Sequence, residues 1–209
     1  MVQAWAETLL KRTAGRFELA DDLQCTMRAR ERRDFLAAVL PHGGTGAELG
    51  VFKGHLTPVL TEVTRPKRLY AVDPWYLAEA EWEWARGHRS TVLGLAGALR
   101  RSRRAIEAGI VDVRVAFDTD FLAELDDAHL DWAYVDTTHQ YEHTCEELEL
   151  LARKVRPGGI VAGDDWQTDP SHRHHGVKRA VDEFVSAGRA NPVRVDETLH
   201  QWAIRLPGL

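Results

Sequence analysis

The sequence predicts an α/β fold in which one doubly wound sheet carries helices on both faces. Short runs rich in apolar and β-branched residues alternate with longer segments whose apolar residues recur at helical spacing. This alternation is typical of a mainly parallel sheet, and the length of 209 residues suits one ordinary domain. We therefore expect a single domain over residues 1–209, made of a helical segment at 1–44 and an α/β core at 45–206.

The strands are expected where apolar runs end at polar or glycine-containing turns. In chain order these runs are Thr45–Leu49, Arg68–Asp73, Asp112–Ala116, Leu130–Asp136 and Ile160–Gly163. Helices are expected between them at Lys53–Thr64, Thr91–Ala108 and Glu142–Lys154, and the chain closes with strands at Pro192–Val195 and Trp202–Leu206. We expect the final strand to be antiparallel. In a doubly wound sheet, ligands bind at the carboxyl ends of the strands, beside the point where the strand order reverses.

Charge and composition exclude several kinds of partner. The formal net charge is -5 and the pI is near 6.1, so no broad attraction to nucleic acid or to an anionic membrane is expected. The two cysteines lie far apart, and no apolar run approaches the roughly 20 residues that a membrane helix needs. We expect a cytoplasmic protein with no nucleic-acid or membrane partner.

The first strand-to-helix turn carries one acidic residue and two glycines. Glu48, Gly50 and Gly54 are arranged as E-x-G-x-x-x-G. Glycines at such a turn permit positive φ and let a ligand approach the backbone, and the following helix offers free N–H groups. The pattern resembles motif I of the class I methyltransferases, which bind S-adenosylmethionine at this turn. That resemblance implies that these three residues belong to the methyl-donor site.

Two further carboxylates follow the next strands. Asp73 ends the second expected strand, where a carboxylate can accept hydrogen bonds from both hydroxyls of an adenosine ribose. The alternative, that Asp73 caps a following helix, is common in proteins. Asp118 lies just past the third strand, a region that meets the adenine in class I methyltransferases. The resemblance therefore implies that Asp73 and Asp118 complete the S-adenosylmethionine site.

Three carboxylates fall at the ends of the fourth and fifth strands. Asp136 ends the fourth expected strand, and Asp164 and Asp165 directly follow the fifth. If these strands are parallel neighbours the three side chains converge, and unpaired carboxylates at such a point repel one another strongly. A divalent cation removes this repulsion, and all-oxygen ligation selects Mg²⁺, Mn²⁺ or Ca²⁺ over zinc. We expect these three residues to bind Mg²⁺ or Mn²⁺; a solvated loop or a helix cap is the alternative for the Asp164–Asp165 pair.

The second half of the chain carries the more specific motif. It reads V-D-x-x-H-x-Y and then R-P-G-G-x-V-x-x-D-D, between residues 135 and 165. This motif resembles the metal-dependent O-methyltransferases that include the macrolide sugar O-methyltransferases, and its carboxylate placement is similar to that of catechol-type O-methyltransferases. The resemblance covers roughly residues 45–206. One departure is Thr137, where some sugar-specific relatives carry an acidic residue, so direct or water-mediated metal binding by Asp136 stays open.

The resemblance implies methyl transfer from S-adenosylmethionine to a hydroxyl of a sugar or oligosaccharide. The chain looks most like the enzymes that methylate methylmannose-type acceptors at the 1-O position. His139 is our expected general base, because an unperturbed imidazole titrates at about pH 6.5; a structural hydrogen bond at a helix N-terminus is the alternative. His143, one turn further along, is expected to be an exposed helical residue.

The acceptor is defined less sharply than the donor. Trp75, Tyr76, Trp82 and Trp84 suit stacking on sugar rings, but aromatic residues in a lid can also simply exclude water. The histidine-rich stretch 172–175 is expected to be a solvated loop beside the pocket.

Two other functions stay open. One is methylation of a catechol or other vicinal diol on a natural product. The other is a non-methylating homologue, either hydroxylase-like or a module that only binds the cofactor. The intact set of Asp136, His139, Asp164 and Asp165 argues against a degenerate binding module. Related enzymes commonly form dimers, so the resemblance also implies a homodimer.

Overall fold

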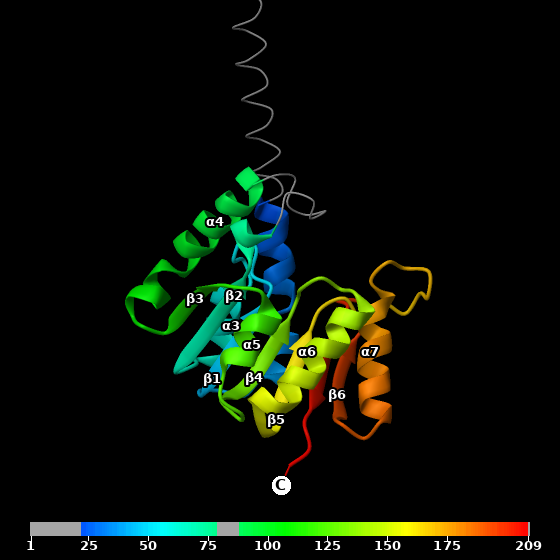
Figure 1. Ribbon diagram of the computed structural model, residues 1–209. Coiled ribbons are helices and arrows are strands. Elements are labelled where there is room, and N and C mark those ends of the chain that lie inside the picture. The colour runs from blue at the N-terminus through cyan, green and yellow to red at the C-terminus, as the bar shows by residue number, and fades with distance from the viewer. Residues whose placement is uncertain (1–21, 79–87, 209) are drawn as a thin grey trace, which may run out of the picture.

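A seven-stranded sheet runs through the centre of the computed structural model, which describes residues 22–78 and 88–208 (Figure 1). Its strand order is β3-β2-β1-β4-β5-β7-β6. The strands are β1 (Thr45–Leu49), β2 (Arg68–Asp73), β3 (Val111–Val115), β4 (Leu130–Val135), β5 (Val155–Gly163), β6 (Asn191–Asp196) and β7 (Gln201–Arg205). Strands β1 to β5 pair in parallel, whereas β7 pairs antiparallel with both β5 and β6. The predicted α/β fold with an antiparallel final strand is confirmed.

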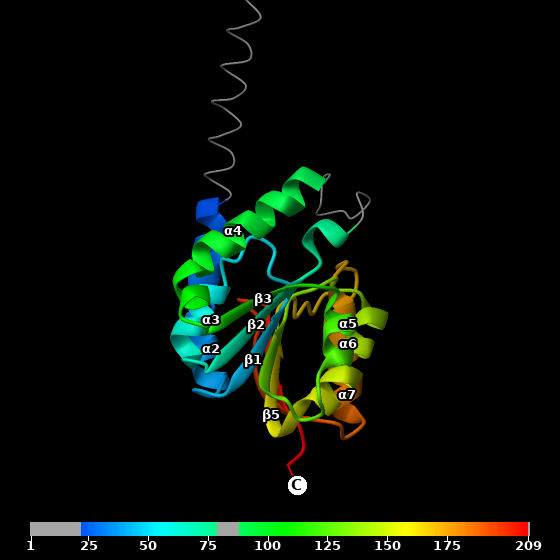
Figure 2. The ribbon, with the colours of Figure 1, turned by 60° about the vertical axis from the view of Figure 1, so that its left-hand side comes forward.

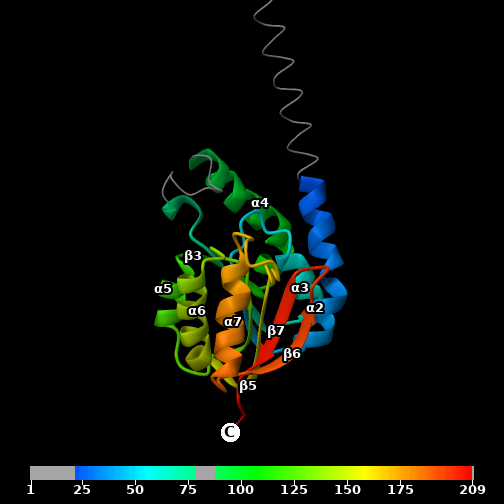
Figure 3. The same ribbon diagram turned by 90° about the vertical axis from the view of Figure 1, so that its right-hand side faces the viewer.

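Helices cover both faces of the sheet, as Figures 2 and 3 show. One face carries α2 (Arg33–Val39), α3 (Thr57–Thr64) and α4 (His88–Glu107). The other face carries α5 (Asp118–Glu124), α6 (Tyr141–Lys154) and α7 (His175–Ser186). A short 3-10 helix, η1 (Trp75–Leu77), follows β2, and residues 22–31 are helical ahead of α2. The expected helical start is therefore confirmed for residues 22–39, while residues 1–21 lie outside the described part of the chain.

Strand β4 shows why the sheet is buried on both faces. Leu130, Ala133 and Val135 belong to the core cluster that includes residues of α6 and α7. Trp132 and Tyr134 belong to the opposite cluster, which includes residues of α2 and α3. Alternate side chains of a strand point to opposite faces, so a strand in this position must be apolar throughout. This requirement explains the apolar run from Trp132 to Val135, which follows the half-buried Asp131.

Some elements begin or end away from the expected residues. The helix expected from Lys53 begins at Thr57, because Gly54 has a φ of 72° and lies against α4, where a Cβ would sit 2.5 Å from the Cα of Ala98. β5 begins at Val155, ahead of its expected start, and β4 ends at Val135. Asp136 therefore lies on the turn after β4. Among the helices of residues 22–78 and 88–208, none combines the length and apolarity needed to cross a membrane.

Candidate active site

A cavity of about 900 Å³ opens at the carboxyl ends of the parallel strands. This edge is where a doubly wound sheet binds its ligands. Most of the site residues predicted from the sequence line the cavity: Gly50, Asp73, Asp118, Asp136, His139, Asp164 and Asp165. Glu48 and Gly54 are not among the lining residues.

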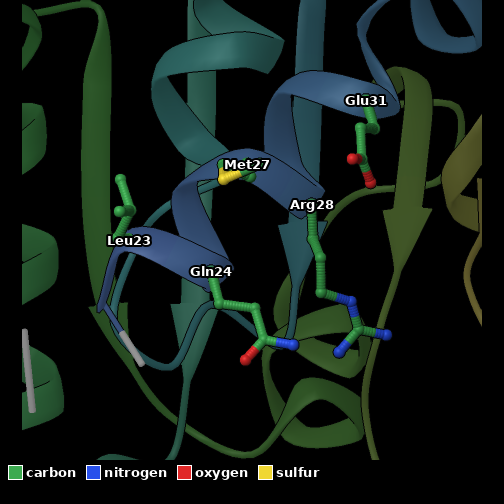
Figure 4. A pocket seen from close by; sticks show the side chains of 5 residues that line it. All are labelled: Leu23, Gln24, Met27, Arg28 and Glu31. Carbon is green, nitrogen blue, oxygen red and sulfur yellow. The ribbon is translucent and has the colours of Figure 1, made fainter. Parts of the chain in front are cut away.

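A second pocket of about 500 Å³ lies on the helical segment formed by residues 22–31 (Figure 4). Its lining consists of Leu23, Gln24, Met27, Arg28 and Glu31, and only Arg28 also lines the larger cavity. Because this pocket contains no residue from a strand end, the larger cavity is the candidate active site.

The strand order sets the order of the predicted residues along the cavity. From one side to the other come Asp118 after β3, Asp73 at the end of β2, Gly50 after β1, Asp136 after β4 and Asp164 after β5. Neighbouring strands lie about 4.8 Å apart. The residues expected to bind the donor therefore occupy one end of the cavity, and the carboxylate cluster occupies the other.

The turn after β1 approaches the end of β4 closely. Gly50 has a φ of 85°, and a Cβ at this position would lie 1.9 Å from the carbonyl oxygen of Asp136. The N–H of Gly50 donates to the carbonyl oxygen of Val72 at 2.9 Å. Only glycine fits this conformation and this spacing, so the first glycine of the motif is required for the two loops to meet.

Asp73 holds the same turn in place through backbone hydrogen bonds. Its Oδ2 accepts from the N–H groups of Val51 at 3.0 Å and Phe52 at 2.8 Å, and its Oδ1 accepts from Trp75 at 2.8 Å. Burial raises the pKa of Asp73, although these three hydrogen bonds oppose the shift. A carboxylate has about four acceptor positions, and Asp73 lines the cavity. Its structural role is therefore plain, while its contact with a ribose stays a prediction.

Glu48 is buried beneath the turn instead of facing the cavity. Its side chain is almost completely excluded from solvent, and burial raises its pKa to about 8. Within the described residues, its Oε2 atom has no hydrogen-bond partner. Glu48 is thus a neutral buried group near pH 7.

We expect the Glu48→Gln variant to gain stability over the wild type by an amount that grows from about pH 5 to about pH 8. The folded-state pKa of about 8 lies above the ordinary value of 4.5, so in this window the folded protein keeps a proton that the unfolded chain releases. Stability contributed by this proton is lost as the pH rises, whereas Gln carries no such proton. Urea denaturation at several pH values measures the difference; a gain that does not change with pH would contradict a neutral Glu48.

Asp118 is paired with residues of α6. Its Oδ2 lies 2.8 Å from Nε2 of His143, and the same nitrogen lies 3.8 Å from Oε1 of Glu147. Burial would raise the pKa of Asp118, but the contact with His143 outweighs burial and lowers it. Burial and the charge of Asp118 raise the pKa of Glu147 well above its ordinary value. The expectation that His143 is exposed was wrong, because its side chain is half-buried, lines the cavity and bonds a buried carboxylate.

The three carboxylates predicted to converge do so. Asp136, Asp164 and Asp165 each place one oxygen within 4.8 Å of the others. Burial and the neighbouring charge of Asp136 raise the pKa of Asp164 to about 7. Gln201 fixes the Asp164 carboxylate by donating from Nε2 to its Oδ1 at 2.6 Å. Burial contributes most to this shift, and the repulsion expected from the sequence adds to it.

The guanidinium of Arg32 lies among these carboxylates. Its Nη2 donates to Oδ2 of Asp164, and its Nη1 lies 3.3 Å from both Oδ2 of Asp136 and the hydroxyl of Tyr134. The Arg32 side chain is only 12% exposed. The cluster therefore carries a cationic partner supplied by the helical N-terminal segment, which the sequence did not predict.

His139 and His174 face the two oxygens of Asp165. His139 Nδ1 lies 2.8 Å from Oδ2, and His174 Nδ1 lies 3.0 Å from Oδ1. The two rings stack with centroids 4.5 Å apart. Burial would lower the pKa of His139, but the contact with Asp165 and the charge of Asp136 raise it. Both His139 and Asp165 have a φ of 61°, a conformation that is costly for such residues and is concentrated at functional sites.

Sequence reasoning gave no role in the site to Arg32, His143 or His174, although it placed the stretch 172–175 beside the pocket. Arg32 stands in a stretch rich in arginine, R-A-R-E-R-R, and nothing in its spacing distinguishes it from its neighbours. His174 lies in the loop that was expected to be solvated, yet its side chain is only 14% exposed and lines the cavity. Only the fold shows which of several similar residues reaches the site.

The aromatic patch after β2 is described in part. Trp75 is buried, and its Nε1 donates to the carbonyl oxygen of Phe52 at 2.7 Å. It therefore supports the turn after β1, while Tyr76 is 49% exposed. Trp82 and Trp84 lie outside the described residues.

A family model described as a methyltransferase domain matches residues 47–166. The chain belongs to this methyltransferase family. This match identifies the chain as a methyltransferase. The matched range runs from β1 to the residue after the Asp164–Asp165 pair, so it includes every site residue that the sequence predicted.

Solved structures show the same fold at low sequence identity. A protein from Methanococcus maripaludis, assigned as an S-adenosylmethionine-dependent methyltransferase, is 12% identical with a TM-score of 0.62, over 91% of this chain and 89% of that chain. The geranyl diphosphate C-methyltransferase from Streptomyces coelicolor is 12% identical with a TM-score of 0.59, over 85% and 76% of the two chains. A methyltransferase from Geobacter sulfurreducens is 14% identical with a TM-score of 0.55, over 86% and 78%. A search of curated protein sequences found no significant match.

Proposed function

We propose that this methyltransferase transfers the methyl group of S-adenosylmethionine to a hydroxyl oxygen of a sugar or oligosaccharide, and that it uses Mg²⁺ or Mn²⁺. The observation that carries the proposal is the convergence of Asp136, Asp164 and Asp165 in the cavity that also contains Gly50 and Asp73. One end of this cavity suits the methyl donor, and the other suits a cation and an oxygen acceptor.

The donor end is assigned by the order of residues along the sheet. We place the methionine part at Gly50, the ribose at Asp73 and the adenine near Asp118. These residues follow β1, β2 and β3, which are consecutive neighbours in the sheet. An extended donor lying across the strand ends would meet them in this order, with its methyl group towards β4.

The carboxylate end suits a hard divalent cation. Asp136, Asp164 and Asp165 supply only oxygen atoms. Burial raises the pKa of Asp164 most, and the charges of Asp136 and Asp165, which such a cation would balance, raise it further. When bound, the cation lowers the pKa of a coordinated hydroxyl and orients a pair of acceptor oxygens. Asp136 can bind the cation directly or through water. The neighbouring residue, Thr137, supplies no carboxylate to the cluster, and its hydroxyl donates to Glu147 at 2.7 Å.

His139 is the proposed general base. Its Nδ1 faces Asp165, which fixes the ring, and its Nε2 lies 3.9 Å from Oδ1 of Asp136. The ring nitrogen that is not held by Asp165 therefore points towards the carboxylate cluster, where the acceptor hydroxyl would lie. His139 accepts a proton only in its neutral form, and the carboxylates that raise its pKa are the groups that the cation would neutralise.

The lining of the cavity favours a sugar over a catechol. Thr138 and Gln140 line the cavity beside the carboxylate cluster and carry polar side chains. These groups can exchange hydrogen bonds with the several hydroxyls of a sugar ring, whereas a catechol needs an apolar slot for its ring.

A methyl-transfer assay with labelled S-adenosylmethionine tests the acceptor. The panel contains methylmannose oligosaccharides, free hexoses and simple catechols, each with Mg²⁺ and with chelator. We expect Mg²⁺-dependent labelling of a sugar, with a methylmannose-type acceptor modified at the 1-O position as the first candidate. Labelling of catechols alone would show that the acceptor is an aromatic diol instead of a sugar. Labelling of no hydroxyl compound would contradict O-methylation.

We also propose a homodimer. The helical segment at residues 22–31 exposes Leu23 and Met27, which are 63% and 54% exposed, and apolar side chains on one helix face suit a subunit interface. Light scattering coupled to size exclusion measures the mass in solution, and a monomer at all protein concentrations would contradict the proposal.

Removal of the Arg32 charge is expected to strengthen divalent-cation binding. The guanidinium contacts Asp136 and Asp164, so a cation that binds these oxygens must compete with it. We expect Arg32→Gln to bind Mn²⁺ roughly tenfold more tightly, because it removes a positive charge in direct contact with the site. Electron paramagnetic resonance titration of Mn²⁺ measures the affinity. Arg33→Gln is the control, since Arg33 is exposed and pairs with Glu62; weaker binding in Arg32→Gln would show that Arg32 helps the cation instead.

A further inference from the structure

The end of the cavity furthest from the carboxylate cluster combines an aromatic ring with a carboxylate. Phe117 is 42% exposed and lines the cavity, and the next residue, Asp118, is buried and lines it as well. An exposed ring offers a face for stacking, and a carboxylate accepts hydrogen bonds but donates none. Together they suit a planar heterocycle whose edge carries a hydrogen-bond donor.

The carboxylate of Asp118 is held by α6. Asp118 begins α5, whereas its partner His143 lies in the first turn of α6, and the two helices are neighbours (Figure 3). The 2.8 Å contact from His143 Nε2 to Oδ2 occupies one oxygen of the carboxylate. One turn further along α6 lies Glu147, which is fully buried and whose Oε1 accepts a hydrogen bond from Thr137. The orientation of Asp118 is therefore set by groups outside α5.

We propose that His143 is a positioning residue that holds Asp118 to receive the exocyclic amine of the donor's adenine, so that this pair distinguishes adenine from hypoxanthine. The inference rests on the proposed donor site. Adenine presents an N–H donor at its 6-position, whereas hypoxanthine presents a carbonyl oxygen, which a fixed carboxylate repels. A carboxylate that could rotate away from the base would discriminate less between adenine and hypoxanthine. His143 thereby affects donor selectivity without touching the reacting atoms.

The test compares the binding of S-adenosylhomocysteine and S-inosylhomocysteine by calorimetry. For the wild type we expect a preference for the adenosine compound of about tenfold or more, the usual size of the effect when a hydrogen bond to a charged group is lost. For His143→Ala we expect this ratio to fall to about threefold or less, with most of the loss in the affinity for the adenosine compound. His143→Gln keeps an N–H donor and is expected to recover a large part of the ratio.

His129→Ala is the matched control. His129 pairs with the hydroxyl of Tyr70 at 3.1 Å and does not line the cavity, so its removal should leave the ratio unchanged. If His143→Ala weakens both compounds equally, His143 is merely structural and the inference is overturned. The same conclusion follows if the wild type does not distinguish the two compounds. Failure of the wild type to bind either compound would overturn the proposed donor site itself, and the inference with it.

Discussion

Replacement of Asp164 by Asn is expected to lower kcat/KM for methyl transfer by about a thousandfold while the Kd for S-adenosylmethionine stays within about threefold of the wild type. Asp164 lies at the centre of the carboxylate cluster, and Asn removes the negative charge while it keeps an oxygen for the hydrogen bond from Gln201. A cation contributes several kcal/mol of charge stabilisation to the transition state, which corresponds to this loss of rate. The donor end lies two to four strands away, at the ends of β1, β2 and β3, and is expected to be unaffected.

Steady-state kinetics at saturating Mg²⁺, combined with calorimetry of the donor, separates these two quantities. Asp169→Asn is the control, because Asp169 is exposed in the loop after β5 and does not line the cavity. If Asp164→Asn retains activity stimulated by Mg²⁺, then Asp164 is not a ligand of the cation.

Replacement of Asp73 by Ala is expected to damage both donor binding and stability. The substitution leaves the N–H groups of Val51, Phe52 and Trp75 without their acceptor, and each buried unsatisfied donor costs about 1–3 kcal/mol. Water from the cavity can satisfy some of them, so we expect a loss of roughly 3 kcal/mol in the free energy of unfolding, or a fall in Tm of about 6–12 °C. Donor affinity should fall by about a hundredfold, because the ribose contact and the shape of the turn are lost together.

Thermal unfolding and calorimetry measure these effects, with Asp120→Ala as the control. Asp120 is exposed in the first turn of α5 and lines no part of the cavity. Asp73→Asn adds a second comparison, since it keeps one acceptor oxygen and should fall between the wild type and Asp73→Ala. Wild-type donor affinity in Asp73→Ala would contradict the assignment of β2 to the donor end.

The sequence was sufficient to predict the sheet and the residues at its strand ends. Strands β1 and β2 begin and end at the predicted residues, because buried parallel strands are mostly apolar and are bounded by polar or glycine residues, although β1 also contains the buried Glu48. The same regularity predicted that Asp136 meets the pair Asp164 and Asp165, since β4 and β5 are parallel neighbours. Periodicity and strand ends are local features, and local features can be read from one sequence.

The remaining partners of these residues depend on contacts between distant segments. Arg32 reaches Asp136 and Asp164 across more than a hundred positions in the chain, a pairing that no spacing rule contains. His143 was expected to be exposed because its position in α6 alone does not show that α5 lies beside it. Glu48 belongs to the motif, yet its neutral form near pH 7 depends on burial that a pattern does not specify. The sequence therefore predicts which groups are present at the cavity better than how they are paired.

The dependence of methyl transfer on Mg²⁺ tests the central claim most directly. The protein is first treated with chelator, and the initial rate of label transfer from S-adenosylmethionine to the best acceptor is then measured as Mg²⁺ is added back. The carboxylate cluster predicts negligible transfer in chelator and a saturable return of activity with Mg²⁺ or Mn²⁺. Equal rates in chelator and in Mg²⁺ would contradict it, and would leave Asp136, Asp164 and Asp165 as hydrogen-bond and ion-pair partners of neighbouring side chains.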